Sequence, residues 1–448
     1  GGLGRRNVGV VGNFADSMIP LHGYHALMDL RADPAVFDAP PKGREQGLYC
    51  GPGVWYDAES KRIHIRLAHT VYEGLDKANY AGETDPRRMP LVIGGAESAL
   101  RVEGAAHLRF QDLVFRGTRT ATVRVAGARD IVFEGVTVYG GSPTFSVERT
   151  EGLRLLHSAL RGVSAPWSSR ASEKYRGLSA YLFTSGRENH GFEMAWCEFT
   201  DCHDGLTIGS IHGLQFHHNL VDNFNDDGLY LTTGLPPGRD IRIHHNRISR
   251  CLSSLSFAGS GAGQEDTVAY IHRNIFDLRE PINRGHAQMG SRGAPARTCG
   301  DHGGPIWMPM MIYQNTFLLP ETMWRGYYGG GLTRAMNNTR RQIVNNIFCH
   351  VKGMPQFGLL FSETAEGLLL DYNLHWSTEG GPEYEGDFLA ASRKPLSRRP
   401  NWHEESKKTY PPGWTAHDLF ADPRFASVSA DWREPAALTL AEDSPARK

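Results

Sequence analysis

Short runs of alternating apolar and polar residues recur along the middle of the chain, each followed by a polar corner and a second short apolar run. Alternation with a period of two is typical of a β-strand that buries one face. The windows that show this pattern span residues 107–115, 130–138, 152–160, 191–199, 213–221, 240–248, 267–276, 310–317, 341–348 and 367–376. We therefore expect this part of the chain to consist of short strands.

The apolar residue that anchors each window recurs at a nearly constant interval. Phe110, Phe133 and Leu155 follow one another at 23 and 22 residues, and Ile243 and Tyr270 are 27 residues apart. A period of this size with two or three strands indicates a solenoid, in which each unit buries its apolar face by stacking on its neighbours. A β-propeller blade needs about 40 to 45 residues, so the shorter interval disfavours that alternative.

Asparagine occupies the same corner in successive windows, at Asn219, Asn246, Asn274, Asn315, Asn346 and Asn373. Asparagine tolerates left-handed backbone and can hydrogen-bond the asparagine of the next coil. The sequence therefore predicts an all-β fold, a single-stranded right-handed parallel β-helix of about ten coils with loop-rich N- and C-terminal caps.

The regions on either side of the repeats differ from them. Residues 1–95 are loop-rich, with one hairpin-like stretch at 54–67, and are expected to cap the open end of the solenoid because terminal units need a polar outer face. Residues 96–376 are assigned to the β-helix, with long loop insertions near 164–190 and 280–307. Residues 377–448 are polar and rich in proline, and we expect them to pack along the flank or to cap the other end.

Composition narrows the class of protein. Hydrophobic residues make up 40% of the chain and charged residues 22%, which is typical of a globular protein. The net charge of -1 disfavours a dedicated nucleic-acid binder, and no apolar run approaches the ~18 residues of a membrane span. None of the six cysteines lies in a Cys-x-x-Cys pair, which disfavours a zinc ribbon. Cys202 and Cys251 lie at equivalent positions two coils apart, about 9.6 Å, too far for a disulfide.

Three segments carry a resemblance to known proteins: the Gly-Val-Trp-Tyr-Asp hairpin at 53–57, the coils with stacked asparagines, and the closing stretch with ADPRF, DWRE and SPAR. The chain resembles the right-handed β-helix proteins that act on carbohydrates: pectate-lyase-like polysaccharide lyases, β-helical glycoside hydrolases and uronan epimerases. The resemblance implies a polysaccharide or oligosaccharide as the partner. It also implies a secreted or periplasmic location, although no signal peptide precedes Gly1.

A cluster of acidic residues is the first candidate for chemistry. Two successive coils begin with His203-Asp204 and Asp226-Asp227, each followed by a glycine. Aligning the glycines places Asp204 over Asp227 and His203 over Asp226, about 4.8 Å apart. Glycoside hydrolysis needs one protonated and one ionised carboxyl group, and like charges at this spacing raise one pKa. The alternative is that Asp-Gly forms plain corner turns.

A histidine and a glutamate precede this cluster by one coil. If Gly191 matches Gly205, His190 takes the place of Asp204, where it would act as an acid, a base or a corner hydrogen-bonding group. Glu193 is expected to point outward, between the inward Phe192 and Met194.

The two long insertions are expected to form the walls of a substrate cleft, because loops of more than ~12 residues are commonly functional. They are rich in arginine, which pairs with carboxylate or sulfate and so indicates an acidic sugar; ordinary solvated loops are the alternative. Aromatic side chains would stack on sugar rings. The candidate substrate-binding residues are Tyr230, Glu193, Lys174, Arg176, Arg284, His286 and Trp307.

Two histidine pairs, His217-His218 and His244-His245, sit at equivalent corners of adjacent coils. They suggest a metal cluster, but a stacked structural corner is the simpler interpretation. No cofactor is therefore expected, with an oxygen-ligand Ca²⁺ site near Asp226 and Asp227 as the alternative.

Three functions follow from these residues. The first is a glycoside hydrolase that uses Asp204, Asp226 or Asp227. The second is a lyase or C5-epimerase on a uronic-acid polymer, which needs a base such as His190 or His203 and arginines that neutralise the carboxylate. The third is a non-catalytic glycan-binding solenoid.

Overall fold

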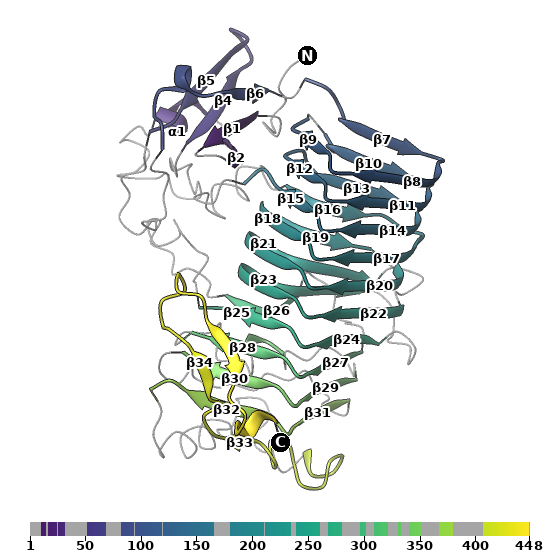
Figure 1. Ribbon diagram of the computed structural model, residues 1–448, viewed down its shortest axis with the longest axis vertical. Helices are drawn as coiled ribbons and strands as arrows, with labels where there is room; N and C mark the ends of the chain where they lie inside the picture. The colour runs from purple at the N-terminus through teal and green to yellow at the C-terminus, as the bar shows by residue number, and fades with distance from the viewer. Residues whose placement is uncertain are drawn as a thin grey trace. The chain divides into compact units, whose positions relative to one another are not determined.

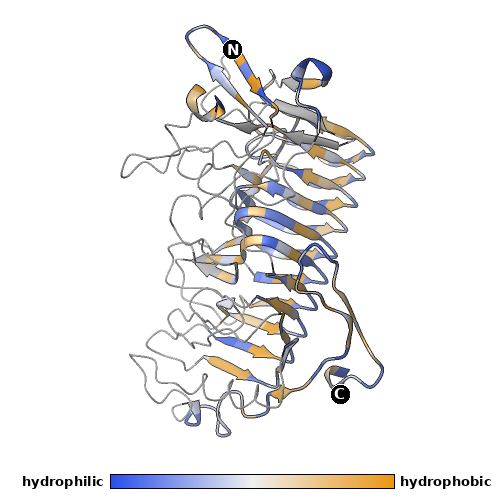
Figure 2. Cartoon of the chain, turned by 90° about the vertical axis from the view of Figure 1, so that its left-hand side faces the viewer, coloured by the Kyte–Doolittle hydropathy of each residue, from blue (hydrophilic) through white to orange (hydrophobic). Residues whose placement is uncertain are grey.

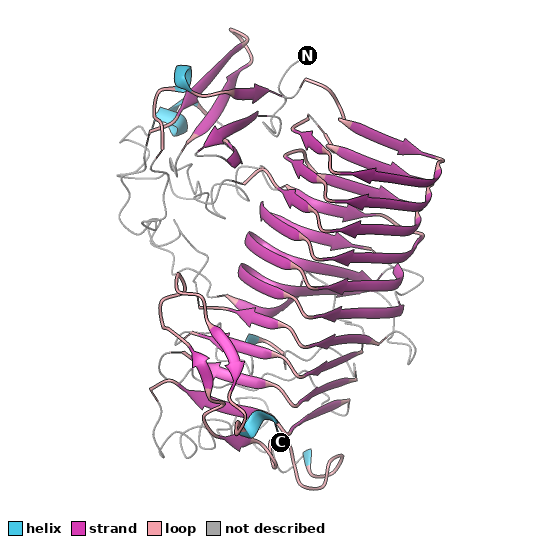
Figure 3. Ribbon diagram, in the orientation of Figure 1, coloured by secondary structure: helices cyan, strands magenta, loops and turns pink. Residues whose placement is uncertain are grey.

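The structure is a computed structural model that describes residues 10–14, 17–24, 26–31, 52–68, 82–93, 95–118, 120–164, 180–209, 211–233, 239–259, 268–279, 296–301, 309–320, 330–332, 340–351, 367–379 and 406–447. These residues are almost all in β-strands and turns, with one short helix, α1 (Leu27–Arg31), and the 3-10 turns η1 (Pro86–Arg88) and η5 (Pro445–Arg447) (Figure 3). The chain divides into two compact units. The first comprises Gly1–Ile208, Leu220–Leu229 and Ile282–Ala294, and the second comprises Gly209–Asn219, Tyr230–Pro281 and Pro295–Lys448.

The strands of the first unit form three parallel ladders (Figure 1). One ladder contains β7 (Leu100–Glu103), β10 (Val123–Ala126), β13 (Phe145–Glu148), β16 (Tyr181–Ser185) and β19 (Asp204–Ile208). The second contains β8 (Ala106–Gln111), β11 (Arg129–Glu134), β14 (Glu151–Leu156) and β17 (Asn189–Ala195). The third contains β9 (Val114–Arg116), β12 (Thr137–Tyr139), β15 (Ala159–Arg161), β18 (Glu198–Cys202) and the start of β21 (Leu220–Thr233).

The second unit repeats the same principle. One parallel ladder contains β20 (Ile211–His217), β22 (Arg239–His244), β24 (Ala269–His272), β27 (Met310–Tyr313), β29 (Arg341–Val344) and β31 (Leu368–Asp371). Another contains β23 (Arg247–Gly259), β25 (Ile275–Asp277), β28 (Thr316–Leu319), β30 (Ile347–His350), β32 (Leu374–Ser377) and β33 (Leu419–Phe420), and β26 (Arg297–Asp301) also pairs with β23. The chain is thus all-β, with long parallel sheets that fit a parallel β-helix.

Antiparallel strands precede the ladders. β1 (Val10–Phe14) pairs antiparallel with β2 (Ser17–Pro20) and β6 (Leu91–Ile93), whereas β3 (His22–Gly23) pairs parallel with β4 (Gly53–Asp57). β4 also pairs antiparallel with β5 (Arg62–Arg66), which confirms the hairpin predicted from the sequence. The Asp57 carboxylate closes its turn by accepting the backbone N–H of Glu59 at 3.0 Å. An Asp side chain that captures a backbone N–H two residues later is a favoured turn device.

Alternate strand residues build the core. Ile131 and Phe133 on β11 have no exposed surface, and the alternation of hydrophobic and polar positions along the strands is visible in Figure 2. Phe110 stacks on Phe133 with ring centroids 4.8 Å apart. In the second unit a ladder of phenylalanines runs through Phe276, Phe317 and Phe348 at 4.9 and 4.8 Å. Stacked aromatic rings at the strand spacing bury large apolar areas, which holds successive coils together.

The predicted spacing of the core residues is confirmed in one place and wrong in another. Phe110, Phe133 and Leu155 are direct ladder partners, as expected. Ile243, however, pairs with Ile271 and not with Tyr270. Tyr270 is half-buried and lies under the guanidinium of Arg242, 5.2 Å from its ring centroid. A shift of one residue moves a side chain to the other face of a strand, so the error exchanged an inward for an outward position.

The predicted asparagine ladder is confirmed in the second unit. The Oδ1 of each asparagine accepts the backbone N–H of the asparagine one coil earlier, at 2.9 to 3.0 Å, through Asn219, Asn246, Asn274, Asn315, Asn346 and Asn373. The ladder ends where Asp418 Oδ1 accepts the N–H of Asn373. The left-handed residue is not the asparagine but the one before it, for example His245 or Arg273. The asparagine is therefore required for its side-chain amide and not for its backbone conformation.

The C-terminal residues pack on the second unit. β34 (Phe425–Ser427) and β35 (Ala437–Leu440) form an antiparallel pair, and apolar residues of this segment cover Leu318, Cys349 and Val351. Arg279, almost fully buried, forms a two-pronged pair with Asp277 and donates to the Ser429 carbonyl at 2.9 Å. A buried guanidinium with this many acceptors anchors the segment.

The five described cysteines are thiols, so the prediction that Cys202 and Cys251 form no disulfide is confirmed. Burial raises the pKa of Cys197, Cys299 and Cys349 to about 12, so these thiols stay protonated and packed as small apolar groups.

Candidate functional site

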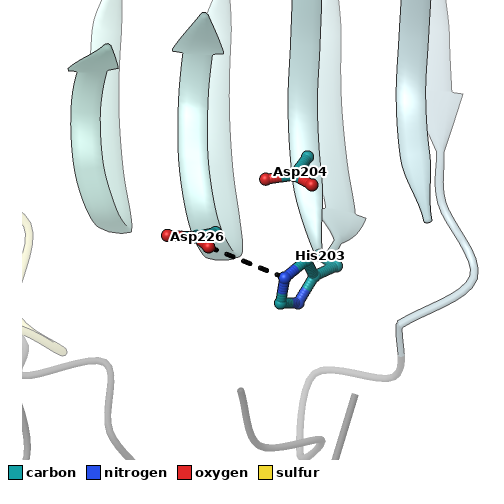
Figure 4. A group of neighbouring side chains, drawn as sticks. All are labelled: His203, Asp204 and Asp226. Atoms are coloured by element: carbon teal, nitrogen blue, oxygen red, sulfur yellow. Dashed lines mark ion pairs between the residues drawn. The ribbon is translucent and has the colours of Figure 1, made fainter. Parts of the chain in front are cut away.

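Three chemically active side chains converge at the start of β19 in the first unit. His203 directly precedes this strand, Asp204 is its first residue, and Asp226 lies on the neighbouring β21 (Figure 4). The backbone N–H of Asp226 donates to the His203 carbonyl at 2.8 Å, which fixes the two strands side by side. Residues distant in the sequence therefore meet because of strand pairing.

The side chains of this His203–Asp204–Asp226 cluster are close enough to share a proton or an ion. The Nε2 of His203 lies 3.7 Å from Asp226 Oδ2. One nitrogen of His203 and one oxygen each of Asp204 and Asp226 all lie within 4.8 Å of one another.

The predicted alignment of the aspartates is corrected by the structure. It placed Asp227 beside Asp204, whereas the strand hydrogen bond places Asp226 there. In these parallel ladders, the N–H of a residue donates to the carbonyl of the residue just before its ladder partner. Leu220, for example, donates to the Cys197 carbonyl and is paired with Glu198. By the same rule Asp226, which donates to the His203 carbonyl, is paired with Asp204. The alignment of Gly205 with Gly228 was therefore wrong by one residue.

Burial differs sharply among the acidic residues. Only 2 % of His203 and 1 % of Asp226 and Asp227 are exposed, whereas Asp204 is half-buried. A buried carboxylate is costly unless it is paired or hydrogen-bonded. Asp226 has the His203 imidazole beside it, and Asp204 is the member of the cluster that reaches the surface.

A glycine makes this close approach of the two strands attainable. A Cβ on Gly205 would lie 2.0 Å from the carbonyl oxygen of Gly228, far inside van der Waals contact. Gly205 lies within β19 and Gly228 within β21, and neither has a positive φ. The two Asp-Gly pairs thus lie within β19 and β21.

Asp201, a further carboxyl group close to the cluster in the sequence, was not among the predicted site residues. Asp201 at the end of β18 accepts hydrogen bonds from Asn223 Nδ2 and Thr200 Oγ1, both at 2.7 Å. Burial raises the pKa of Asp201, and the two hydrogen bonds oppose that rise. Asp201 and Asn223 are both left-handed, with φ near +65°, at equivalent corners 22 residues apart. That recurrence of Asp and Asn at the coil period was the available signal.

The other predicted residues are distributed as follows. His190 is exposed on β17, which pairs with β14, whereas Asp204 is on β19, which pairs with β16. The prediction that His190 takes the place of Asp204 is therefore wrong, because Gly191 and Gly205 belong to different ladders. Glu193 is a half-buried outward residue beside Arg154 on the same ladder as His190, between buried Phe192 and Met194, as predicted.

Tyr230 is half-buried and belongs to the second unit. Five predicted substrate-binding residues lie outside the described residues: Lys174, Arg176, Arg284, His286 and Trp307.

The donors of the cluster suit two kinds of chemistry. An imidazole with two carboxylates can move protons between groups whose pKa values differ. The same set, one nitrogen and two oxygens, suits Zn²⁺ or Mn²⁺ better than Ca²⁺, which takes six to eight oxygen ligands. The predicted alternative of a calcium site would need further oxygen ligands, and Asp227 is the adjacent buried carboxyl.

Comparisons with known proteins give little. No protein-family model and no curated protein matches the chain. Among solved structures the chain is similar to the periplasmic alginate epimerase AlgG, with a TM-score of 0.25 and 10% sequence identity, covering 63% of this chain and 69% of that one. A likeness at this level assigns neither a family nor a reaction to this chain. Among the described residues, no helix is long and apolar enough to cross a membrane.

Proposed function

We propose that this protein is a carbohydrate-active enzyme that cleaves glycosidic bonds of a poly- or oligosaccharide by carboxylate-based hydrolysis at the His203–Asp204–Asp226 cluster. The observation that carries the proposal is the approach of two carboxyl groups, on adjacent parallel strands, to within 4.8 Å between oxygens, with one of them half-exposed. Glycoside hydrolysis requires a pair of carboxyl groups in different protonation states. Retaining enzymes hold them about 5 to 5.5 Å apart, which is the range nearest to this spacing.

The two aspartates would divide the roles by environment. Asp204 reaches the surface and is the group that would give a proton to the leaving oxygen. Asp226 faces the His203 imidazole at 3.7 Å, so a positive imidazole would favour its ionised form.

A second reaction is favoured by a different observation, the buried contact of His203 with Asp226. A carboxylate that orients an imidazole is the usual support for a general base. In a lyase or C5-epimerase such a base removes the proton next to the uronate carboxylate, and arginines neutralise that carboxylate. Arg176 and Arg284, with Lys174, would supply that charge, and the substrate would then be an acidic polymer met outside the cytoplasm.

One incubation distinguishes the two reactions. The protein is mixed with a panel of neutral and uronate-containing polysaccharides, and new reducing ends and ultraviolet absorbance from an unsaturated uronate are followed together. Hydrolysis gives reducing ends without absorbance, and elimination gives both. Epimerisation gives neither, but in D₂O it places deuterium at C5. If the protein binds a polymer but gives none of these signals, the result favours the third function, a non-catalytic glycan-binding protein.

The proposed site is tested with Asp204→Asn, which keeps the shape and removes the acid. We expect activity to fall by about 10²- to 10⁴-fold, the usual contribution of a general acid. Glu151→Gln, at an exposed carboxylate on β14 of the same unit, is the matched control and should keep full activity. Equal activity of the Asp204 variant and the wild type would refute the assignment.

A further inference from the structure

A second cluster of titratable groups lies in the second unit, at the ends of β20 and β22. His217 closes β20 and is the direct ladder partner of His244, which closes β22. His218 and His245 follow them with φ of 57° and 56°. We call these four residues the histidine corners.

The four rings form a regular array. His217 stacks on His244 at 4.9 Å and His218 on His245 at 4.7 Å, with interplanar angles of 2° in both cases. Within each corner the rings are perpendicular, and the two Nδ1 atoms lie 2.9 Å apart in the first corner and 2.8 Å apart in the second. Each corner thus brings two imidazole nitrogens to within hydrogen-bonding distance of one another.

The corners beyond do not repeat this pair. The next described corners of the ladder carry His272-Arg273 and Tyr313-Gln314, and only the stack of first rings continues, at 4.9 Å per step. Adjacent histidines are therefore not a general requirement of this corner.

The Nδ1 spacing matches a particular metal geometry. Two ligands at about 2.0 Å from a metal ion and at right angles to each other are about 2.8 Å apart, whereas tetrahedral ligands are about 3.3 Å apart. Right-angle coordination by nitrogen is the preference of Cu²⁺ and Ni²⁺. His218 and His245 are exposed and the rings beside them half-buried, so an ion can arrive from solvent.

We propose that the histidine corners are a transition-metal site, in which the two Nδ1 atoms of one corner bind a Cu²⁺ or Ni²⁺ ion as neighbouring ligands of a square plane. In the hydrogen-bonded state one ring carries its proton on Nδ1. Binding moves that proton to the Nε2 of the same ring through solvent, so both Nδ1 lone pairs face the ion and the neutral pair keeps its charge.

The array also predicts the stoichiometry. The corners are 4.7 to 4.9 Å apart along the stack, too far for one ion to be held by four nitrogens at about 2.0 Å. Each corner therefore takes its own ion. Two dications at this distance repel each other, so the first binds more tightly than the second.

The test uses the untagged full chain, titrated with CuCl₂ and NiCl₂ by calorimetry and followed by Cu²⁺ electron paramagnetic resonance. We expect one tight Cu²⁺ per chain with hyperfine splitting from two nitrogens, and weaker binding of Zn²⁺, which prefers the tetrahedral spacing. The double variant His218→Asn/His245→Asn should bind at least about 30-fold more weakly. Asparagine tolerates left-handed backbone, so the double variant keeps the corner conformation.

The matched control is His107→Asn. His107 is an exposed histidine with φ of 59°, and its Nδ1 faces Asp130 and not a second histidine. It should bind Cu²⁺ like the wild type. Binding to the double variant as tight as to the wild type, a spectrum without nitrogen splitting, or Zn²⁺ preferred over Cu²⁺ would each overturn the proposal.

Discussion

The Nε2 of His203 lies 3.7 Å from the Oδ2 of Asp226, with 2 % of each side chain exposed. The pair is buried next to half-exposed Asp204. The candidate site thus combines two buried groups with one that reaches solvent.

Replacing the imidazole tests its role in this site. His203→Gln should lower kcat/KM by about 10²-fold, the lower end of the effect of a lost acid–base group, and should remove one ionisation from the pH–rate profile. His157→Gln, at an exposed histidine stacked on Trp196, is the control. A pH profile identical to that of the wild type would show that His203 only fills space.

The close approach of β19 and β21 predicts the effect of adding a methyl group. Gly205→Ala would place Cβ 2.0 Å from the Gly228 carbonyl oxygen, so the strands must separate. We expect a loss of at least about 1–3 kcal/mol in the free energy of unfolding, together with loss of activity. Gly95→Ala has no neighbouring atom within 4 Å and should change neither. Urea denaturation monitored by circular dichroism measures the difference.

The asparagine ladder predicts a large cost for losing one amide. Asn274→Ala removes the acceptor of the Asn246 N–H and the donor to the Ile243 carbonyl. Each buried group left without a partner costs about 1–3 kcal/mol, so the free energy of unfolding should fall by about 2–6 kcal/mol. Gln342→Ala, at a half-buried position on β29, should cost much less. Similar urea midpoints for the two variants would contradict the ladder as a source of stability.

The half-buried Asp201 predicts a dependence on pH. Its pKa is raised in the folded state, so the folded chain holds a proton that the unfolded chain releases. Stability should therefore fall as pH rises from below the unfolded value of about 4 through the folded pKa. Asp201→Asn removes this loss and keeps a residue suited to its left-handed φ of 66°. The urea midpoint of the variant should exceed that of the wild type at pH 7 but not at pH 3. Equal midpoints of the two proteins at both pH values would refute the prediction.

The repeating part of the fold was predictable because its signals are local. The alternation around Phe110 and Phe133 and the recurrent Asn246 and Asn274 each need only one coil to be recognised. Every coil must bury one face of its strands, and the stacked corners each need a side-chain amide. The pattern therefore repeats in the sequence.

The register of the strands, and which strands belong to the same ladder, were not predictable from the same pattern. Ile271 and Tyr270 are adjacent apolar residues, and only packing decides which one points inward. His190 and Asp204 each lie next to a glycine, yet they belong to different ladders, because insertions change the number of residues between equivalent strands. The site has the same origin, since the backbone bond between Asp226 and His203 sets which carboxyl meets the imidazole.

The sequence by itself determined the all-β class, the stacked asparagines and the residue types that could do acid–base chemistry, because these depend on the polarity of individual positions. Only the tertiary structure decided that Asp226, and not Asp227, is the ladder partner of Asp204, and that Asp204 stays half-exposed. A parallel ladder joins residues a full coil apart, and their separation in the sequence does not specify the register that brings them together.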